Sequence, residues 1–364
     1  MFHMINLSPL LLLLLLLNHD PIQMTNAELG CDYSNGNWVY DPTYPLYNSA
    51  QCPFIEHVFN CQRNGRRDRT YLKYRWLPLG RCRLTRFNGT EFLQNFKGKS
   101  IMFVGDSLSR DQYQSLLCLL YTSSPGIKYN ETRVGDISTV TFSDFGVKVK
   151  LDRNVYLVDL VPKKIGRVLI LDSVARKSAA WLANDVLVFN TYAWWNRSGA
   201  SQPWDFVQVG RKKLKDIDRT VAFKTALNTW AKWVNFKIDP AQIKVFFQTV
   251  SPTHYNGAEW DSPQAKSCKR ETSPVLGPVY PGPPPPALAI QKEIIRSKIN
   301  NTAVRLLDIT HLSQFRKDAH PTIYGEFGGS GMDCLHWCIA GVTDTWNEIL
   351  FNHLFQMPLQ NSLM

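Results

Sequence analysis

Short apolar runs alternate along the chain with longer segments in which apolar residues recur at helical spacing. The runs that predict buried strands are 101–104, 168–171, 185–189, 244–248 and 304–307. The segments that predict amphipathic helices are 108–121, 219–234, 287–299 and 343–355. Runs bounded by polar or turn residues are typical of core strands, and period 3.6 is typical of helices. The alternation predicts an α/β fold with a central, mostly parallel sheet, helices on both faces, and ligands at the carboxyl ends of the strands.

The N-terminal segment 1–27 differs from everything that follows. It holds an apolar stretch, Leu10–Leu17, extended by Ile5 and Leu7 and followed by polar residues and Ala27. This stretch is shorter than the roughly 20 residues that span a membrane, and it suits the apolar part of a secretory signal. No Lys or Arg precedes it and no clear cleavage motif follows. We expect a signal peptide, with an uncleaved signal anchor as the alternative.

Cysteine usage agrees with passage through the secretory pathway. All eight cysteines lie beyond segment 1–27, which we call the leader. They are an even set, which suits an oxidising compartment. Their spacing alone allows 105 pairings. Four sites for N-glycosylation point the same way: Asn88, Asn130, Asn196 and Asn300.

The chain of 364 residues carries a formal charge of +11. Such a balance favours an anionic partner or surface. Its basic runs, including 63–69 and 211–215, lack the signature of a nucleic-acid-binding fold, so we expect no nucleic acid. An acidic polysaccharide such as pectin is one interpretation, and a solvated basic face is the other. Membrane contact is expected only through the leader if it stays as an anchor.

Candidate chemistry begins at Ser107, which follows the strand 101–104 and opens the helix 108–121. The free N–H groups and positive dipole end of a helix N-terminus favour an oxyanion on an attacked ester carbonyl. Gly105 is expected to allow a tight turn before this serine. A serine hydroxyl becomes a strong nucleophile only when an oriented base takes its proton.

Asp333 and His336 can supply that base and its orienting carboxylate from one short turn. His336 lies between Cys334 and Cys338, so bridges at both cysteines would clamp the turn from both sides. The two cysteines with the histidine also suggest a metal site. That reading leaves Asp333 unexplained whereas a Ser-His-Asp triad uses it, and we therefore expect no metal.

Several blocks of the sequence resemble one family. They are Cys31–Asp41; Tyr74, Arg75, Trp76, Pro78, Gly80 and Cys82; Gly105–Gln112; Asn190–Trp195; Asp216–Trp233; and Asp333–Asn347. Together they resemble the plant trichome birefringence-like (TBL) family of polysaccharide O-acetyltransferases, related to the GDSL/SGNH esterases. The resemblance implies an SGNH-hydrolase-like (flavodoxin-like) three-layer sandwich with a disulfide-stapled N-terminal extension. It covers residues 30–364 as a single PMR5N/PC-esterase-type unit, with a Cys-rich part (30–85) and a catalytic part (98–364).

The same resemblance assigns roles to residues. Ser107 would be the acylated nucleophile, His336 the general acid and base, and Asp333 the group that orients His336. The Ser107 backbone N–H and the Asn190 side chain would form the oxyanion hole, with Gly105 and Asp106 supporting the turn. The implied disulfides are Cys31–Cys82, Cys52–Cys118, Cys61–Cys338 and Cys268–Cys334.

Other positions leave two interpretations each. Trp194 and Trp195 either stack on sugar faces or pack in the core. His254 either contacts a substrate or makes structural hydrogen bonds. The family usually has His where Ala193 stands, Ser where Leu335 stands, and commonly Asn where Asp111 stands. These departures affect how substrates would be held and remove no member of the triad.

The predicted function is transfer of an acetyl group, through an acetyl-Ser intermediate, to hydroxyls of a plant cell-wall polysaccharide such as xylan, mannan or pectin. The acetyl donor, acetyl-CoA or another acetylated compound, is expected as a co-substrate, with no bound cofactor. We expect a monomer in the Golgi lumen or secreted to the wall. The alternatives are a polysaccharide acetylesterase and a polysaccharide-binding protein without turnover.

Overall fold

The computed structural model describes residues 31–299, 303–325 and 332–355. The predicted leader (1–27) and the Asn300 glycosylation site lie outside the described residues. Asn88, Asn130 and Asn196, the other predicted glycosylation sites, are all exposed to solvent.

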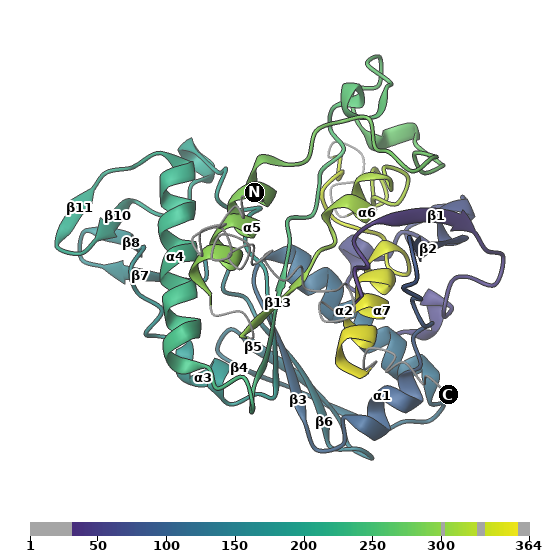
Figure 1. Ribbon diagram of the computed structural model, residues 1–364, viewed down its shortest axis with the longest axis horizontal. Helices are drawn as coiled ribbons and strands as arrows, with labels where there is room; N and C mark the ends of the chain where they lie inside the picture. Colours follow the sequence, from purple (N-terminus) through teal and green to yellow (C-terminus); the bar gives the residue numbers. More distant parts are fainter. Residues whose placement is uncertain (1–30, 300–302, 326–331, 356–364) are drawn as a thin grey trace, which may run out of the picture.

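A seven-stranded sheet forms the centre of the molecule, in the order β13-β12-β9-β3-β6-β5-β4 (Figure 1). Its parallel strands are β3 (Ser100–Val104), β6 (Val147–Asp152), β9 (Val186–Phe189), β12 (Lys244–Gln248) and β13 (Val304–Leu307). Two antiparallel strands complete one edge, β5 (Ile137–Phe142) and β4 (Tyr129–Val134). Every residue of β3 is buried, as expected for a strand covered on both faces. The predicted mostly parallel sheet is confirmed.

Helices cover both faces of this sheet, which makes three layers (Figure 1). The layer on one face contains α1 (Gly89–Asn95), α2 (Ser107–Ser123) and α7 (Val342–Phe355), and the layer on the other contains α3 (Ser178–Leu182), α4 (Arg219–Lys237) and α5 (Pro286–Lys298). Alternate residues of β3 separate the two cores: Ile101 packs on the α2 side and Met102 on the α4 side. Within the described ranges, no helix is long and apolar enough to cross a membrane.

One predicted core strand, 168–171, is placed elsewhere. It corresponds to β8 (Gly166–Ile170) in a separate four-stranded sheet. That sheet has the order β11-β10-β8-β7, with β7 (Asp159–Lys163), β10 (Phe206–Val209) and β11 (Lys212–Leu214). In the central sheet the position beside β3 belongs to β6, in which Lys148 and Lys150 alternate with buried valines. An apolar run indicates burial but does not specify which sheet receives the strand.

The Cys-rich N-terminal part packs directly on the catalytic part. Its hairpin, β1 (Gly36–Tyr40) and β2 (Tyr74–Pro78), shares one hydrophobic core with α2 and α7. Cys52–Cys118 and Cys61–Cys338 bridge the two parts, and Cys31–Cys82 and Cys268–Cys334 complete the set. These are the four pairs that the family resemblance implies. The disulfide-stapled extension is therefore part of the same packed unit.

The remaining helical elements are short. They are α6 (Thr310–Gln314) and the 3-10 turns Ser49–Gln51, His57–Phe59, Thr70–Leu72, Gly199–Ser201, Gly257–Trp260 and Cys268–Arg270.

Candidate active site

Ser107 is the first residue of α2, directly beyond the carboxyl end of β3. Gly105 precedes it because the chain has no room for a side chain there: a Cβ would lie 2.4 Å from the Asn190 carbonyl oxygen and 2.5 Å from Ser109 Oγ. The absence of a side chain at Gly105 therefore allows the segment after β9 to approach this turn closely. Ser107 is half-buried.

Asp106 caps α2 and ties it to the segment that follows β9. Its Oδ1 accepts from the Leu108 N–H at 3.0 Å, and its Oδ2 accepts from the N–H groups of Tyr192 and Ala193 at 3.2 and 3.1 Å. Burial raises the pKa of Asp106, and these backbone donors oppose the rise. The expected supporting role of Asp106 is thus carried by hydrogen bonds to two segments of the chain.

His336 links Ser107 to Asp333. Its Nε2 lies 2.7 Å from Ser107 Oγ, and its Nδ1 lies 2.8 Å from Asp333 Oδ2. The other oxygen of Asp333 accepts from the N–H groups of Leu335 and His336, both at 3.0 Å. The carboxylate therefore holds both the imidazole and the turn that carries it. With Nδ1–H toward Asp333, the Nε2 lone pair faces the serine hydroxyl.

The pKa shifts of Asp333 and His336 suit an orienting carboxylate and a general base, respectively. Burial alone would raise the pKa of Asp333, but its hydrogen bond to His336, the charge of that imidazole and two backbone donors lower it to about 2. Burial opposes the charged form of His336, yet its hydrogen bond to Asp333 and the nearby Asp111 carboxyl raise its pKa above the ordinary value. Asp333 stays ionised at any pH near neutrality.

The oxyanion donors predicted from the sequence lie at the same edge of the sheet. The Asn190 amide is oriented with its nitrogen toward Asp106, 2.5 Å from Oδ1, because the opposite orientation would set its oxygen against a carboxylate. An amide nitrogen carries two hydrogens, so one N–H remains for a reacting oxygen. The Ser107 N–H, at the start of α2, finds no acceptor among the described residues. Their oxyanion role stays a prediction.

Of the two tryptophans expected either to stack on sugars or to pack in the core, Trp195 packs in the core, and the substrate-binding role of Trp194 stays a prediction. Trp195 is fully buried, surrounded by Tyr156, Trp204 and Phe223, and its Nε1 donates to Thr191 Oγ1 at 2.8 Å. Its ring is therefore core and cannot stack on a sugar. Trp194 is only partly buried, but the Arg197 guanidinium covers its face at 3.6 Å.

His254 is also buried and has a structural role. Its ring nitrogens lie 2.8 Å from the Gln314 carbonyl and 2.6 Å from His320 Nε2. His320 in turn lies 2.6 Å from the backbone carbonyl of His336 and stacks on Trp337. Burial lowers the pKa of His254 to about 4. This pair of imidazoles supports the backbone of His336 from behind and contacts no solvent-filled space.

The sequence did not indicate the contribution of the N-terminal part to this site. The ring of Phe59 lies 5.5 Å from that of His336, and the Arg110 guanidinium lies over Phe59 and pairs with Glu56 at 3.0 Å. One signal was available: Cys61, two residues after Phe59, is bridged to Cys338, two residues after His336.

Asp111 lies one helical turn after Ser107 and is fully buried. Its Oδ2 accepts from the Trp337 N–H at 3.2 Å, and its Oδ1 has no partner among the described residues. Burial raises its pKa to about 8 despite the nearby His336. The sequence marked this position as a departure from the family pattern but assigned it no role.

A cavity of about 310 Å³ is lined by Asp106 and Leu108, the two neighbours of Ser107 in the chain, and we call it the serine-side cavity. Ser107 and His336 themselves are not among its described lining residues. Its lining residues are Asp106, Leu108, Asn190, Tyr192, Ala193, Asn196, Val250, Ser251, Pro252, Thr253, Glu259, Tyr280, Pro283, Pro284, Pro285, Pro286, Gln314 and Leu335. Two of the three departures from the family pattern, Ala193 and Leu335, lie in its wall. None of the described residues that line it is Lys or Arg, whereas Asp106 and Glu259 contribute carboxyls whose pKa values burial raises.

Comparison with known families divides the chain into two matched parts. Residues 84–353 match the GDSL/SGNH-like acyl-esterase family found in Pmr5 and Cas1p, and residues 29–83 match the PMR5 N-terminal domain. The segment that carries Phe59 thus belongs to a different matched domain from Ser107 and His336.

Curated relatives cover nearly the whole chain. It is 53% identical over 351 residues to protein trichome birefringence-like 41 of Arabidopsis thaliana, which covers 96% of each chain. Protein trichome birefringence-like 40 of the same plant is 46% identical over 89% of this chain and 87% of its own. Protein trichome birefringence-like 39 is 46% identical over 93% of this chain and 90% of its own.

Proposed function

The chain belongs to the trichome birefringence-like family, with an acyl-esterase domain of the GDSL/SGNH-like type, and we propose that it transfers acetyl groups to hydroxyls of a plant cell-wall polysaccharide. The observation that carries the proposal is the continuous chain of hydrogen bonds from Asp333 through His336 to Ser107 at the N-terminus of α2. A binding protein without turnover has no need of this arrangement.

The first half-reaction forms an acetyl-serine. His336 Nε2 takes the hydroxyl proton of Ser107 as Oγ attacks the acetyl carbonyl of the donor. The Ser107 N–H and the free Asn190 N–H stabilise the oxyanion, since donors fixed in advance cost no reorganisation when charge develops. The imidazolium then gives its proton to the departing group, which leaves as the carbonyl reforms. Acetyl-CoA or another acetylated compound supplies the acetyl group as co-substrate.

The second half-reaction reverses these roles. A sugar hydroxyl in the serine-side cavity loses its proton to His336 Nε2 and attacks the acetyl-serine carbonyl. Collapse of the tetrahedral intermediate returns the proton to Ser107 Oγ and leaves the acetyl ester on the sugar. Throughout, ionised Asp333 stabilises the imidazolium without accepting its proton.

Polysaccharide acetylesterase is the second candidate, favoured by the acyl-esterase description of the matched family. The two activities share the acetyl-serine and differ only in whether a sugar or water resolves it. We propose that the protein works in the secretory pathway, in the Golgi lumen or at the wall, where four disulfides persist.

The test is an acceptor screen. The purified protein is incubated with an acetylated donor and xylan, mannan or pectin oligosaccharides, and the sugars are analysed by mass spectrometry. We expect new acetyl groups on one acceptor class, whereas release of acetate alone would favour the esterase. Ser107→Ala should abolish both activities. Ser109→Ala is the matched control, because Ser109 is a buried serine of the same helix whose hydroxyl has no partner in the described structure.

A further inference from the structure

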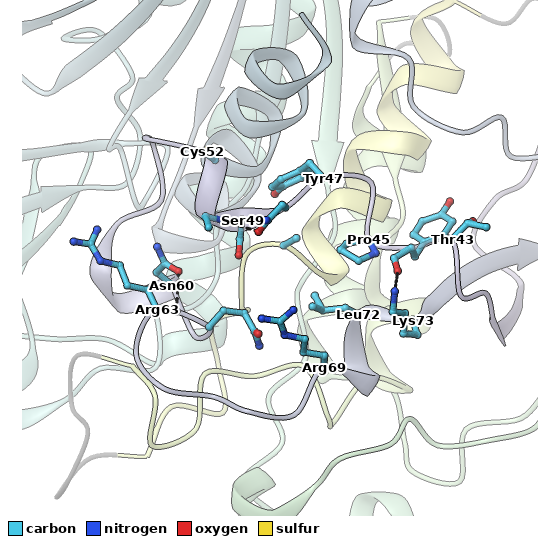
Figure 2. A pocket seen from close by; sticks show the side chains of 15 residues that line it. Thr43, Pro45, Tyr47, Ser49, Cys52, Asn60, Arg63, Arg69, Leu72 and Lys73 are labelled. Atoms are coloured by element: carbon cyan, nitrogen blue, oxygen red, sulfur yellow. Dashed lines mark hydrogen bonds between the residues drawn. The ribbon is translucent and has the colours of Figure 1, made fainter. Parts of the chain in front are cut away.

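A second, larger cavity lies on the N-terminal part, and we call it the N-terminal cavity. It measures about 790 Å³, within the range of cavities that hold small ligands. Residues from 43–52 and 60–73 line it, together with Ala340, which follows His336 by four positions (Figure 2). Among the residues that line it, none belongs to the proposed catalytic machinery.

The charge of its wall is of one sign. Arg63, Arg69 and Lys73 line the cavity, and none of its described lining residues is Asp or Glu. Lys73 is already engaged, because its Nζ donates to the carbonyls of Pro42 and Tyr44. The guanidinium groups of Arg63 and Arg69 have neither an ion pair nor a hydrogen bond within the described part of the chain. Figure 2 shows Arg69 turned toward the middle of the lining residues and Arg63 at their margin.

The amides of Asn48 and Asn60 add donors, whereas the nitrogen of Gln62, the third amide in the lining, already donates to the Asp68 carbonyl and the Tyr71 hydroxyl. The side-chain oxygen of Asn48 accepts from the Ala50 N–H at 3.1 Å, and that of Asn60 accepts from the Arg63 N–H at 3.3 Å. Both amide nitrogens lack an acceptor among the residues described. The cavity therefore offers N–H groups and positive charge, which is the complement of a carboxylate.

The segment that carries these arginines is fixed to the turn of His336. Arg66 is buried and donates to the carbonyls of His320 and Asp318 at 3.0 and 2.6 Å. Cys61 is bridged to Cys338. The basic run 63–69 thus divides by function: Arg66 holds the segment in place, and Arg63 and Arg69 stay available.

We propose that the N-terminal cavity binds a uronate unit of the acceptor polysaccharide, with Arg69 on its carboxylate, the Asn48 and Asn60 amides on neighbouring oxygens, and Arg63 adding positive charge at the margin. A guanidinium matches a carboxylate through two parallel N–H···O bonds. The proposal rests on the proposed function only in that the acceptor is a glycan. It adds that the glycan is acidic and that its charged unit binds away from Ser107.

Binding is measured by calorimetry with the full chain carrying Ser107→Ala, so that no turnover occurs. The probes are a uronate oligosaccharide and the same oligosaccharide with its carboxyl groups reduced to alcohols. We expect Arg69→Gln to weaken binding of the uronate probe about ten-fold or more, and Arg63→Gln by a smaller factor, because charge-assisted hydrogen bonds are the strong ones. The reduced probe should bind weakly to every variant.

Arg67→Gln is the matched control, since Arg67 is an exposed arginine of the same run that does not line the cavity. Equal binding by the Arg67→Gln and Arg69→Gln variants would overturn the proposal, as would equal binding of the reduced probe. Displacement of the uronate probe by acetyl-CoA at comparable concentration would also overturn it in favour of a donor site.

Failure of the catalytic proposal can be distinguished from failure of the uronate-binding proposal. In the background with Ser107 intact, Arg69→Gln and Arg63→Gln should hydrolyse a small aryl acetate at the wild-type rate. Turnover that survives Ser107→Ala would refute the catalytic proposal and leave the binding result standing.

Discussion

The two cavities of this protein differ in charge, and the difference separates two tasks. The described lining of the serine-side cavity has the carboxyls of Asp106 and Glu259 and no cation, whereas the described lining of the N-terminal cavity has cations and no carboxylate. A negative site beside Ser107 suits a neutral sugar ring, whose hydroxyls donate hydrogen bonds to carboxylates. A positive site elsewhere suits an acidic unit. Chemistry and anchoring are therefore expected to respond to different perturbations.

The largest expected effect is that of Asp333→Asn, which should abolish most of the catalysis and leave uronate binding intact. Asp333→Asn removes the charge that stabilises the His336 imidazolium and permits the wrong tautomer, so we expect kcat to fall by about 10³–10⁴-fold. Binding of a uronate oligosaccharide should not change. Asp205→Asn is the control, because Asp205 is likewise held at a pKa of about 2, by Arg167 on the surface. A small loss of kcat for Asp333→Asn would contradict the assigned role.

Of the two disulfides that bridge the N-terminal and catalytic parts, Cys61–Cys338 lies nearer to His336 in the sequence, and we expect its loss to affect both stability and catalysis. Replacing Cys61 and Cys338 by serine removes a bridge between positions 277 residues apart. We expect a loss of about 2–5 kcal/mol of unfolding free energy, and lower kcat because Phe59 and the His336 turn are no longer clamped together. Replacing Cys31 and Cys82 should lower the melting temperature and leave kcat unchanged. Equal kcat for the two double variants would show that the bridge does not position His336.

The third prediction is that catalysis depends on pH and uronate binding does not. His336 must be neutral to accept the serine proton, and its pKa is raised by Asp333 and Asp111. The rate of aryl acetate hydrolysis should therefore rise about ten-fold per pH unit on the acid side and level off above the ordinary histidine pKa of about 6.5. Uronate binding should stay level between pH 5 and 8, because guanidinium groups do not titrate there. The same pH profile for hydrolysis and for uronate binding would contradict the assignment of the two tasks to different cavities.

The smallest expected effect concerns Glu259. If its carboxyl binds sugar hydroxyls, Glu259→Gln should raise KM for the acceptor by about two- to ten-fold, the range of one hydrogen bond. The burst of acetyl-serine formation should be unchanged. Glu293→Gln, an exposed carboxylate of α5 outside both cavities, should alter neither. An unchanged KM for Glu259→Gln would show that the Glu259 carboxyl does not bind the acceptor.

Much of the candidate site was predictable because its members lie in strong local patterns. Ser107 follows an apolar strand and opens a helix, and Asp333 and His336 occupy one turn. Asn190 follows another apolar strand of the same parallel sheet. Parallel strands bring their carboxyl ends to one edge, so residues far apart in sequence meet there. For Trp195 and His254 the sequence left two interpretations open, because an aromatic or imidazole side chain suits a core as well as a ligand site.

The sequence by itself determined the elements around β3, α2, α4, α5 and α7 and indicated Ser107, Asp333 and His336 as the candidate catalytic residues, because periodicity and turn chemistry are local. Only the tertiary structure decided that β8 leaves the central sheet, that β6 takes the place beside β3, and that Trp195 is core. It also placed Phe59 against His336 and divided Arg63, Arg66 and Arg69 between a cavity and a structural contact. These outcomes depend on which surfaces pack together. An apolar run can be buried in several places with similar gain, and an arginine can pair in several places, so only the folded chain decides between them.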